Sequence, residues 1–222
     1  MKIGVIVLAG GSSGRMNGVN KQFASLCGKP VIMHAVGAFL HIEEVKEIAV
    51  VVKEGLEADY RRLFEGTTEK PIKIVTGGST RALSAKNGFL ALSEDCELIA
   101  VHDGARPLID EKLICEVFSD AKRFGAAICA VKSKDTVKIT SGGFIDSTPE
   151  RSTVYNAQTP QVFSRKNYLE MLGGDLMIAT DDASLAEALG IRVKITEGSY
   201  ENIKITTPED IVIAQKIMEG RL

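Results

Sequence analysis

The sequence of 222 residues contains no tryptophan, and aromatic residues make up only 5% of it. This scarcity argues against a surface that binds single-stranded nucleic acid by stacking bases on aromatic side chains. A charge of one sign is also lacking, because 27 basic and 29 acidic residues give a formal net charge of −2. We therefore expect no nucleic-acid partner, although a local cluster of basic residues can still bind a phosphorylated small molecule.

Cysteine and histidine are too few and too widely spaced for a zinc site. The three histidines and the four cysteines (Cys27, Cys96, Cys115 and Cys129) form no C-x-x-C pair and no zinc spacing, so we expect reduced thiols. No hydrophobic run reaches the length of a membrane span. The apolar run 3–9 is at the short end for a signal peptide and leads into a glycine-rich turn. The sequence therefore predicts a cytoplasmic protein without a membrane segment.

Short β-branched runs alternate along the chain with segments of helical period. This alternation predicts an α/β fold with a mostly parallel sheet flanked by helices. Several runs are apolar throughout, as in strands buried on both faces. With 45% apolar residues and no shift in composition, residues 1–222 are expected to form a single domain. The predicted strands are 3–9, 47–53, 72–76, 98–102, 126–131 and 191–196, and the predicted helices are 30–40, 56–64, 80–92, 111–124 and one that starts at Pro208 after the N-cap Thr207.

Residues 135–148, DTVKITSGGFIDST, interrupt this alternation. Polar and apolar residues alternate on both sides of Ser141-Gly142-Gly143, and the glycines can adopt the positive φ of a tight turn. The segment has no neighbouring helix to pack on and few large apolar residues. We therefore expect a β-hairpin that leaves the main body and packs against something else, such as a second subunit.

The glycine-rich segment LAGGSSGRM, residues 8–16, directly follows the first predicted strand. Glycines there allow backbone N–H groups to approach a phosphate closely. The spacing is neither that of the Walker A loop nor that of the dinucleotide fingerprint. Instead, Arg15 and Lys21 supply two cations that could neutralise a triphosphate and the charge that develops when it is attacked. The alternative is a strand-to-helix turn with two solvated basic residues.

The segment VHDGARP, residues 101–107, places Asp103 at the end of a predicted strand. Open α/β folds bind ligands at the carboxyl ends of their strands, and a carboxylate beside a triphosphate is a typical ligand of Mg²⁺. Arg106 could pair with a phosphate or with a neighbouring carboxylate. The alternative is that Asp103 only forms a turn.

Four further segments carry weaker signals. In GGSTRALSAKNG, residues 77–88, the hydroxyl of Ser79 or Thr80 can cap a helix that carries Ser84, and these groups could contact a base or a ribose. Taken singly, AQTPQVF (157–163) is interpreted as a loop, TDDAS (180–184) as an acidic helix start, and ENIKITTPED (201–210) as a strand-to-helix junction.

Together and in this order, these motifs resemble the 2-C-methyl-D-erythritol 4-phosphate cytidylyltransferase family of the non-mevalonate isoprenoid pathway. The resemblance spans residues 8 to about 210, nearly the whole chain. It implies a Rossmann-like nucleotidyltransferase fold that transfers CMP from CTP to a small sugar-alcohol phosphate with the help of Mg²⁺. It also implies a homodimer formed through a protruding β-hairpin arm at about 133–152.

The family's functional residues match positions along the whole chain. By this resemblance, the catalytic cations are Arg15, Lys21 and Lys204. The nucleotide-binding residues are Ala9, Gly10, Gly11, Gly78, Ser79, Ser84 and Asp103, and Asp103 is also the metal ligand. The substrate-binding residues are Asp103, Arg106, Thr136, Arg151, Thr159 and Thr180.

The chain departs from the family pattern at three positions. Leu8 stands where the family has the first of two alanines, Asn20 stands where proline is common, and Gly104 stands where alanine is usual. The variant at Leu8 resembles the related ribitol-5-phosphate cytidylyltransferases of teichoic acid synthesis, which are the near alternative; AQTPQVF and TDDASLAE favour the isoprenoid family. A hexose 1-phosphate is another possible acceptor. A non-catalytic nucleotide-binding regulator is an alternative of a different class, and the two cations near the glycine-rich segment argue against it.

Overall fold

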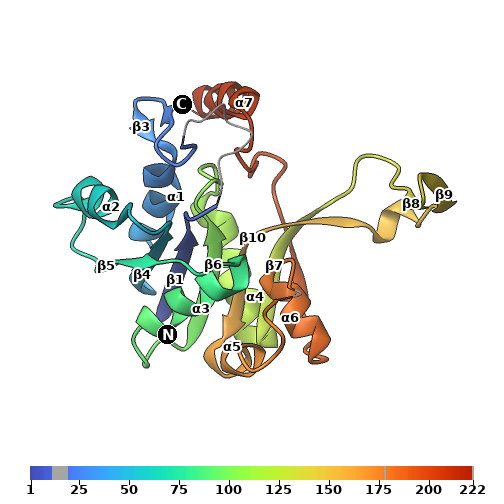
Figure 1. Cartoon of the computed structure of the whole chain (residues 1–222), viewed down its shortest axis with the longest axis horizontal. Coiled ribbons are helices and arrows are strands. Elements are labelled where there is room, and N and C mark those ends of the chain that lie inside the picture. The colour runs from blue at the N-terminus through green and yellow to red at the C-terminus, as the bar shows by residue number, and fades with distance from the viewer. Residues whose placement is uncertain (12–19, 178, 222) are drawn as a thin grey trace.

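The structure, a computed structural model, describes residues 1–11, 20–177 and 179–221. Its centre is a seven-stranded sheet in the order β11-β7-β10-β6-β1-β4-β5 (Figure 1). Only β10 runs antiparallel to its neighbours in this sheet, which confirms the prediction of a mostly parallel α/β sheet. The seven strands are β1 (Ile3–Leu8), β4 (Val45–Val52), β5 (Ile72–Thr76), β6 (Leu98–Asp103), β7 (Ala126–Lys132), β10 (Tyr155–Ser164) and β11 (Lys194–Glu197).

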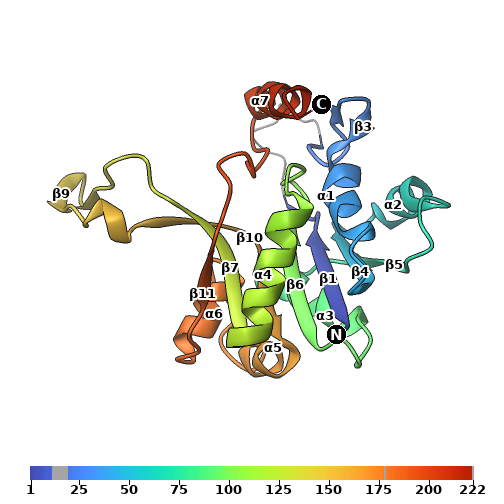
Figure 2. The ribbon, with the colours of Figure 1, turned by 180° about the vertical axis from the view of Figure 1, so that it is seen from behind.

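Helices cover both faces of the sheet (Figure 1 and Figure 2). One core cluster joins one face to α1, α2 and α4, and a second joins the other face to α3, α5 and α6. The last helix packs instead on a small hairpin of two short strands, β2 (Ser25–Leu26) and β3 (Lys29–Pro30). The helices are α1 (Val31–Leu40), α2 (Glu57–Phe64), α3 (Arg81–Ala91), α4 (Glu111–Phe124), α5 (Arg165–Met171), α6 (Asp182–Ala188) and α7 (Pro208–Glu219).

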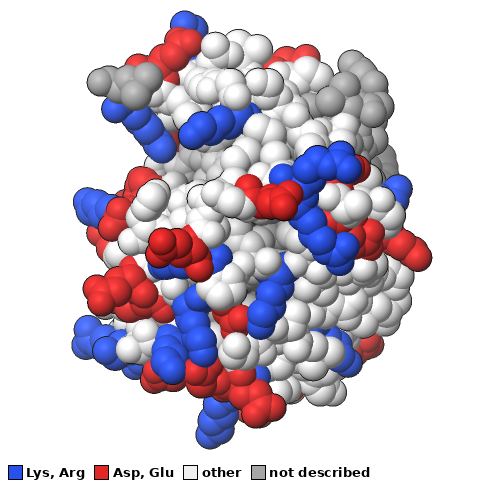
Figure 3. All heavy atoms as spheres, turned by 90° about the vertical axis from the view of Figure 1, so that its left-hand side faces the viewer, with Lys and Arg blue, Asp and Glu red and all other residues white. Residues whose placement is uncertain are grey.

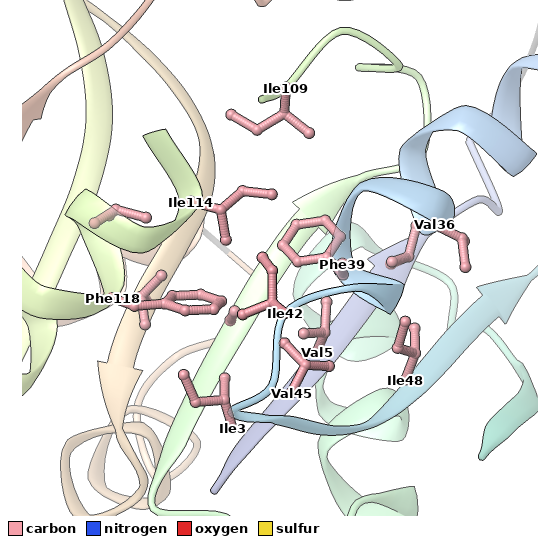
Figure 4. Close-up of a cluster of buried hydrophobic side chains, with 14 of the residues drawn as sticks. Ile3, Val5, Val36, Phe39, Ile42, Val45, Ile48, Ile109, Ile114 and Phe118 are labelled. Carbon is pink, nitrogen blue, oxygen red and sulfur yellow. The ribbon is translucent and has the colours of Figure 1, made fainter. Parts of the chain in front are cut away.

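Figure 4 shows the first core cluster, in which Phe39 of α1 and Ile114 of α4 lie over the strands. Val5 of β1 belongs to this cluster, whereas the next residue, Ile6, belongs to the cluster on the opposite face. Successive side chains of a strand point to opposite faces, so both must be apolar where both faces are covered. This explains why the central strands read as continuous apolar runs.

The structure corrects the interpretation of residues 157–163 as a loop, because they belong to β10 in the middle of the sheet. Proline inside a central strand normally argues against a strand, since it cannot donate to the ladder. Pro160 is accommodated because the pairing of β10 with β7 shifts register between Ala157 and Gln161. Two smaller differences are α5, which the sequence did not predict, and β11, which starts three residues later than expected.

The predicted β-hairpin is present and extends away from the sheet (Figure 1 and Figure 2). Its strands β8 (Ile139–Ser141) and β9 (Phe144–Ser147) are joined by Gly142 and Gly143, whose φ angles are 56° and 86°. Large apolar side chains of this arm are exposed in the single chain, and Phe144 is 80% exposed. The return to the body passes through a short 3-10 turn, η1 (Arg151–Thr153).

The surface in Figure 3, which shows the side of the molecule with α2 and β5, carries basic and acidic side chains in alternation. No extended area of one sign covers the part of this face that the structure describes. Within residues 1–11, 20–177 and 179–221, no helix combines the length and the apolar character needed to cross a membrane.

Candidate active site

A cavity of about 400 Å³ opens where β1 and β6 end side by side. Leu8 and Asp103 are the last residues of these two strands and are partners in the parallel register. The cavity therefore lies at the carboxyl ends of the strands, where open α/β folds bind ligands. The described residues that line it are Leu8, Gly10, Gly11, Lys21, Gln22, Gly78, Ser79, Thr80, Arg81, Ser84, Asp103, Ala105 and Lys204.

Asp103 lies in this cavity with a side chain that is 12% exposed and faces three cations. The Nζ of Lys204 is 2.8 Å from its Oδ2, the Nε of Arg106 is 3.7 Å from Oδ2, and the Nη2 of Arg81 is 3.8 Å from Oδ1. Burial alone would raise the pKa of this carboxyl, but Lys204 and Arg81 outweigh it and lower the pKa to about 2. Asp103 is thus ionised at neutral pH, and its surroundings carry an excess of positive charge.

Lys204 is placed by the segment between β11 and α7. The next residue, Ile205, is buried against α7, and its backbone N–H donates to the carbonyl oxygen of Ala105 at 2.8 Å. This bond joins the Lys204 segment to the turn after β6. Lys21 reaches the cavity from the segment that precedes β2, so two flexible amines from distant parts of the sequence line one hollow. Such an arrangement suits a polyphosphate.

A buried hydrogen-bonded chain fixes the turn that carries Asp103. The N–H of Asp103 donates to Thr159 Oγ1 at 3.0 Å, and Thr159 Oγ1 is 3.1 Å from His102 Nδ1. His102 Nε2 is 3.1 Å from the carbonyl oxygen of Arg106, which can only accept, so Nε2 carries the proton and Nδ1 accepts from the threonine. Burial lowers the pKa of His102 to about 4 and keeps the imidazole neutral. In this structure the hydroxyl of Thr159 therefore positions Asp103.

Arg106 is also engaged within the protein. Its Nη1 donates to the carbonyl oxygen of Asn202 at 2.6 Å, and its side chain lies beside Asp103. The sequence left two partners open for Arg106, a phosphate or a neighbouring carboxylate. In the structure its side chain faces the carboxylate of Asp103. Because Asn202 is two residues before Lys204, this contact also fixes the backbone that presents the lysine. A role of Arg106 in binding substrate stays a prediction.

The GGST turn forms one wall of the cavity. The N–H of Gly78 donates to Ser84 Oγ at 3.0 Å, and the Ser84 hydroxyl donates to the carbonyl oxygen of Thr80 at 2.8 Å. A Cβ at Gly78 would lie 2.5 Å from the Cβ of Leu83, so glycine is needed for the turn to close on the helix. Thr80 caps α3 by accepting from the N–H of Leu83 at 3.1 Å. These residues therefore have a structural role as well as a place on the cavity wall.

Several predicted site residues are not among the described residues that line the cavity. Arg15 lies outside the residues that the structure describes. Ala9 is buried and donates its N–H to the carbonyl oxygen of Val51 at 2.7 Å. Thr136 and Arg151 are exposed on the arm and at its return, and Thr180 is exposed before α6. The arm residues lie on a segment that extends away from the body of their own chain (Figure 1).

Arg81, which lies on the cavity wall, was not predicted from the sequence. Its Nη1 is 2.5 Å from Asp182 Oδ2, and its Nη2 faces Asp103. Arg81 is the first residue of α3, where the helix dipole disfavours a cation. A basic residue at this position, directly after a glycine turn, is the signal that could have identified it.

The described side chains of the cavity do not by themselves form a metal centre. Among the described parts of the chain, no three side chains of His, Cys, Asp and Glu converge to hold an ion. Asp103 supplies the single carboxylate among the described lining residues. Mg²⁺ usually keeps several waters and is bound by one or two carboxylates together with substrate phosphates. Asp103 therefore fits such an ion only as one ligand beside a bound polyphosphate.

Comparison with known proteins identifies the family. Residues 3–220 match the family described as IspD: 2-C-methyl-D-erythritol 4-phosphate cytidylyltransferase. The 2-C-methyl-D-erythritol 4-phosphate cytidylyltransferase of Caldanaerobacter subterraneus subsp. tengcongensis is 41% identical over 97% of this chain and 98% of its own length. That of Dehalococcoides mccartyi is 42% identical over 98% of this chain and 96% of its own length.

A solved structure supports the same assignment. The crystal structure of 4-diphosphocytidyl-2C-methyl-D-erythritol synthase from Anaerococcus prevotii superposes with a TM-score of 0.87 at 35% identity and covers 98% of both chains. Sequence and fold thus agree over nearly the full length. The chain belongs to the 2-C-methyl-D-erythritol 4-phosphate cytidylyltransferase family of nucleotidyltransferases.

Proposed function

We propose that this protein transfers CMP from CTP to 2-C-methyl-D-erythritol 4-phosphate and releases pyrophosphate, forming 4-diphosphocytidyl-2-C-methyl-D-erythritol. The observation that carries the proposal is the excess of positive charge around buried Asp103, in a cavity bounded by glycine turns and lined by Lys21 and Lys204. The names of the relatives at about 40% identity support the cytidylyl group and the methylerythritol acceptor. None of these relatives is named as a ribitol-5-phosphate enzyme, so the comparisons favour the methylerythritol acceptor.

The protein's contribution to this reaction is positioning and charge neutralisation. An oxygen of the acceptor phosphate attacks the α-phosphorus of CTP while pyrophosphate leaves in line. The nucleophile is already an anion, so no side chain has to act as a general base. Arg15, Lys21 and Lys204 neutralise the charge that develops on the phosphates, and the GGST turn holds the nucleoside.

A divalent cation belongs to this proposal, and Mg²⁺ is the expected one. Asp103 is its candidate protein ligand, and the phosphates and water would complete its coordination. When bound, the ion would neutralise charge on the triphosphate. Lys204 now occupies Oδ2 of Asp103 at 2.8 Å, so its amine has to move from this oxygen if the ion binds there.

We further propose that residues 1–222 act as one nucleotidyltransferase domain that dimerises through the arm at about 133–152. The exposed Phe144 and its neighbours on the hairpin supply an apolar surface that a second chain would cover. In such a dimer, Thr136 and Arg151 of one chain would bind the acceptor phosphate in the cavity of the other. A cytoplasmic location also belongs to the proposal, and the unpaired thiols of the four cysteines support it.

The test is pyrophosphate release from CTP and Mg²⁺ with one acceptor at a time. We expect release with 2-C-methyl-D-erythritol 4-phosphate, and much less with ribitol 5-phosphate or a hexose 1-phosphate. The same assay with ATP, GTP and UTP measures the choice of nucleotide. Release with ribitol 5-phosphate alone would assign the alternative acceptor, and no release with any acceptor would leave a nucleotide-binding regulator.

A further inference from the structure

Asp182 is a buried carboxylate behind the cavity wall. It is the first residue of α6, and its side chain is 1% exposed. Its Oδ2 is 2.5 Å from Arg81 Nη1, and its Oδ1 accepts from the hydroxyl of Tyr168 at 3.1 Å. The cap of α6 is made by the preceding residue, Asp181, so the Asp182 side chain is not needed to start the helix. One cation and one hydroxyl thus satisfy a carboxylate that is not among the described residues lining the cavity.

Arg81 connects this carboxylate to the one in the cavity. Its guanidinium binds Asp182 through Nη1 and lies 3.8 Å from Asp103 Oδ1 through Nη2. Burial alone would lower the pKa of Arg81, but Asp182 and Asp103 outweigh it and raise the pKa, so the group is always charged. Arg81 is therefore a cation shared by two carboxylates, with the closer contact on the Asp182 side.

Lys204 is the contrasting neighbour of Asp103. Its side chain is 42% exposed against 27% for Arg81, and its ion pair is with Asp103 itself. A phosphate that enters the cavity competes with Asp103 for this amine. If Lys204 turns to the phosphate, Asp103 loses its nearest cation, and an uncompensated charge at a buried position is costly. Two cations then stay beside Asp103: Arg106, which is bound to the carbonyl oxygen of Asn202, and Arg81, which Asp182 holds.

We propose that Asp182 is a positioning residue for the transfer reaction. By holding Arg81 between the two carboxylates, Asp182 lets the guanidinium offset part of the charge of Asp103 without forming a direct ion pair with it when Lys204 moves to the substrate phosphate. This inference rests on the proposed function. Without Asp182, the guanidinium closes the 3.8 Å gap and forms a direct, two-pronged pair with Asp103. Asp103 then has no oxygen available for the ligand, although each cavity residue is still present.

The experiment compares Asp182→Asn, Arg81→Gln and the double variant by steady-state kinetics and thermal unfolding. Asparagine keeps the size of the side chain and an oxygen for the Tyr168 hydroxyl. We expect Asp182→Asn to lower kcat by roughly ten- to a hundredfold, the cost of misplacing a catalytic group, with little change in the KM for CTP. Because Asp182 acts through Arg81, the double variant should be no slower than Arg81→Gln alone.

The matched control is Glu47→Gln. Glu47 is a buried carboxylate paired with one cation, Lys73, at the opposite end of the same sheet. It should lose thermal stability as Asp182→Asn does, but keep its kcat. If Asp182→Asn lowers the melting temperature and leaves kcat unchanged, or if the losses of the two single variants multiply in the double variant, the positioning role is wrong.

The wild-type protein separates this failure from failure of the proposed function. A wild type that releases no pyrophosphate from CTP with any acceptor overturns the proposed function and this inference with it. An active wild type in which Asp182→Asn behaves like Glu47→Gln overturns the role of Asp182 alone. An active wild type with a lowered kcat in Asp182→Asn and no further loss in the double variant supports it.

Discussion

Two buried carboxylates lie at opposite ends of the same sheet and have similar pKa values but different surroundings. Glu47 is near the start of β4, and Asp103 is at the end of β6. Burial would raise the pKa of Glu47, but Lys73 and the hydrogen bonds from Ser93 lower it to about 2. The pKa of Asp103 is also about 2. Ionisation alone therefore does not distinguish the two ends of the sheet.

The number of partner cations and the presence of a cavity distinguish them. Glu47 pairs with the single amine of Lys73 at 2.5 Å, and the backbone N–H of Ser93 donates to its other oxygen. Asp103 faces Lys204, Arg81 and Arg106 beside an open cavity. In a pair of one carboxylate and one amine the charges cancel, whereas several cations around one carboxylate leave positive charge that an anionic ligand in the cavity can neutralise. The surplus of charge, more than a perturbed pKa, indicates the site.

The largest effect is expected from removing one of the cations that the proposed function assigns to the phosphates of CTP. Lys21→Ala and Arg15→Ala should each lower kcat by a factor on the order of a hundred or more, the cost of losing one contact to the charge of the transition state. Stopped-flow or coupled detection of pyrophosphate measures it. Lys216→Ala, which removes an exposed ion pair with Glu219 on α7, is the control and should keep normal turnover. Near-normal turnover of Lys21→Ala would contradict the role given to the surplus charge.

A subunit-mixing experiment asks whether the cavity end also uses charge from a second chain. If the arm reaches across a two-fold axis, each site combines Arg15 of one chain with Arg151 of the other, so the Arg15→Ala and Arg151→Ala homodimers are both nearly inactive. Co-refolding equal amounts should give about half mixed dimers, each with one intact site and one doubly defective site. The mixture should regain about a quarter of wild-type activity.

The control for this experiment is a mixture of Arg15→Ala with Lys21→Ala. In the shared-site model both residues act in the same site of the same chain, so every site in the mixed dimer carries one defect or the other. No activity should return, although mixed dimers form equally well. Absence of rescue in the Arg15→Ala and Arg151→Ala mixture, with mixed dimers demonstrated by native mass spectrometry, would mean that Arg151 serves its own chain.

The sequence predicted elements whose signal is local and missed those that depend on tertiary contacts. The apolar runs and helical periods located β5 and α4 at their observed bounds, and the glycines located the turn of the arm. β10 was missed because Pro160 hides a strand whose pairing is interrupted at that point.

The same division holds for the cavity. Glycine motifs and strand ends indicated Gly10, Gly78 and Asp103, because their positions follow from local chain geometry. The pair of Arg81 and Asp182 could not be predicted in this way, since 101 residues separate the partners and only the tertiary fold brings the first residues of α3 and α6 together. The internal bonds of Thr159 likewise arise from the placement of β10 next to β6.

A smaller effect on the rate is expected from Asp103→Asn. A neutral amide is a poorer ligand for a hard cation, so the variant should need more Mg²⁺ for half-maximal activity and should turn over more slowly. A titration of initial rate against Mg²⁺ at saturating CTP measures both changes. An unchanged Mg²⁺ dependence would show that Asp103 is not a ligand of the metal, and its role would then be to orient Lys204 and Arg81.

Glu47→Gln is expected to leave the activity unchanged. Glu47 contributes to stability instead, because its pKa is lowered from 4.5 in the unfolded chain to about 2 in the folded one. This contribution is fully present above pH 4.5 and is lost as the pH falls towards 2, and it amounts to about 3 kcal/mol. Urea unfolding from pH 7 to pH 3 should therefore show a steeper loss of unfolding free energy in the wild type than in Glu47→Gln. Parallel curves would show that folding does not lower the pKa of Glu47, and a lowered kcat in Glu47→Gln at pH 7 would show that the two ends of the sheet are not independent.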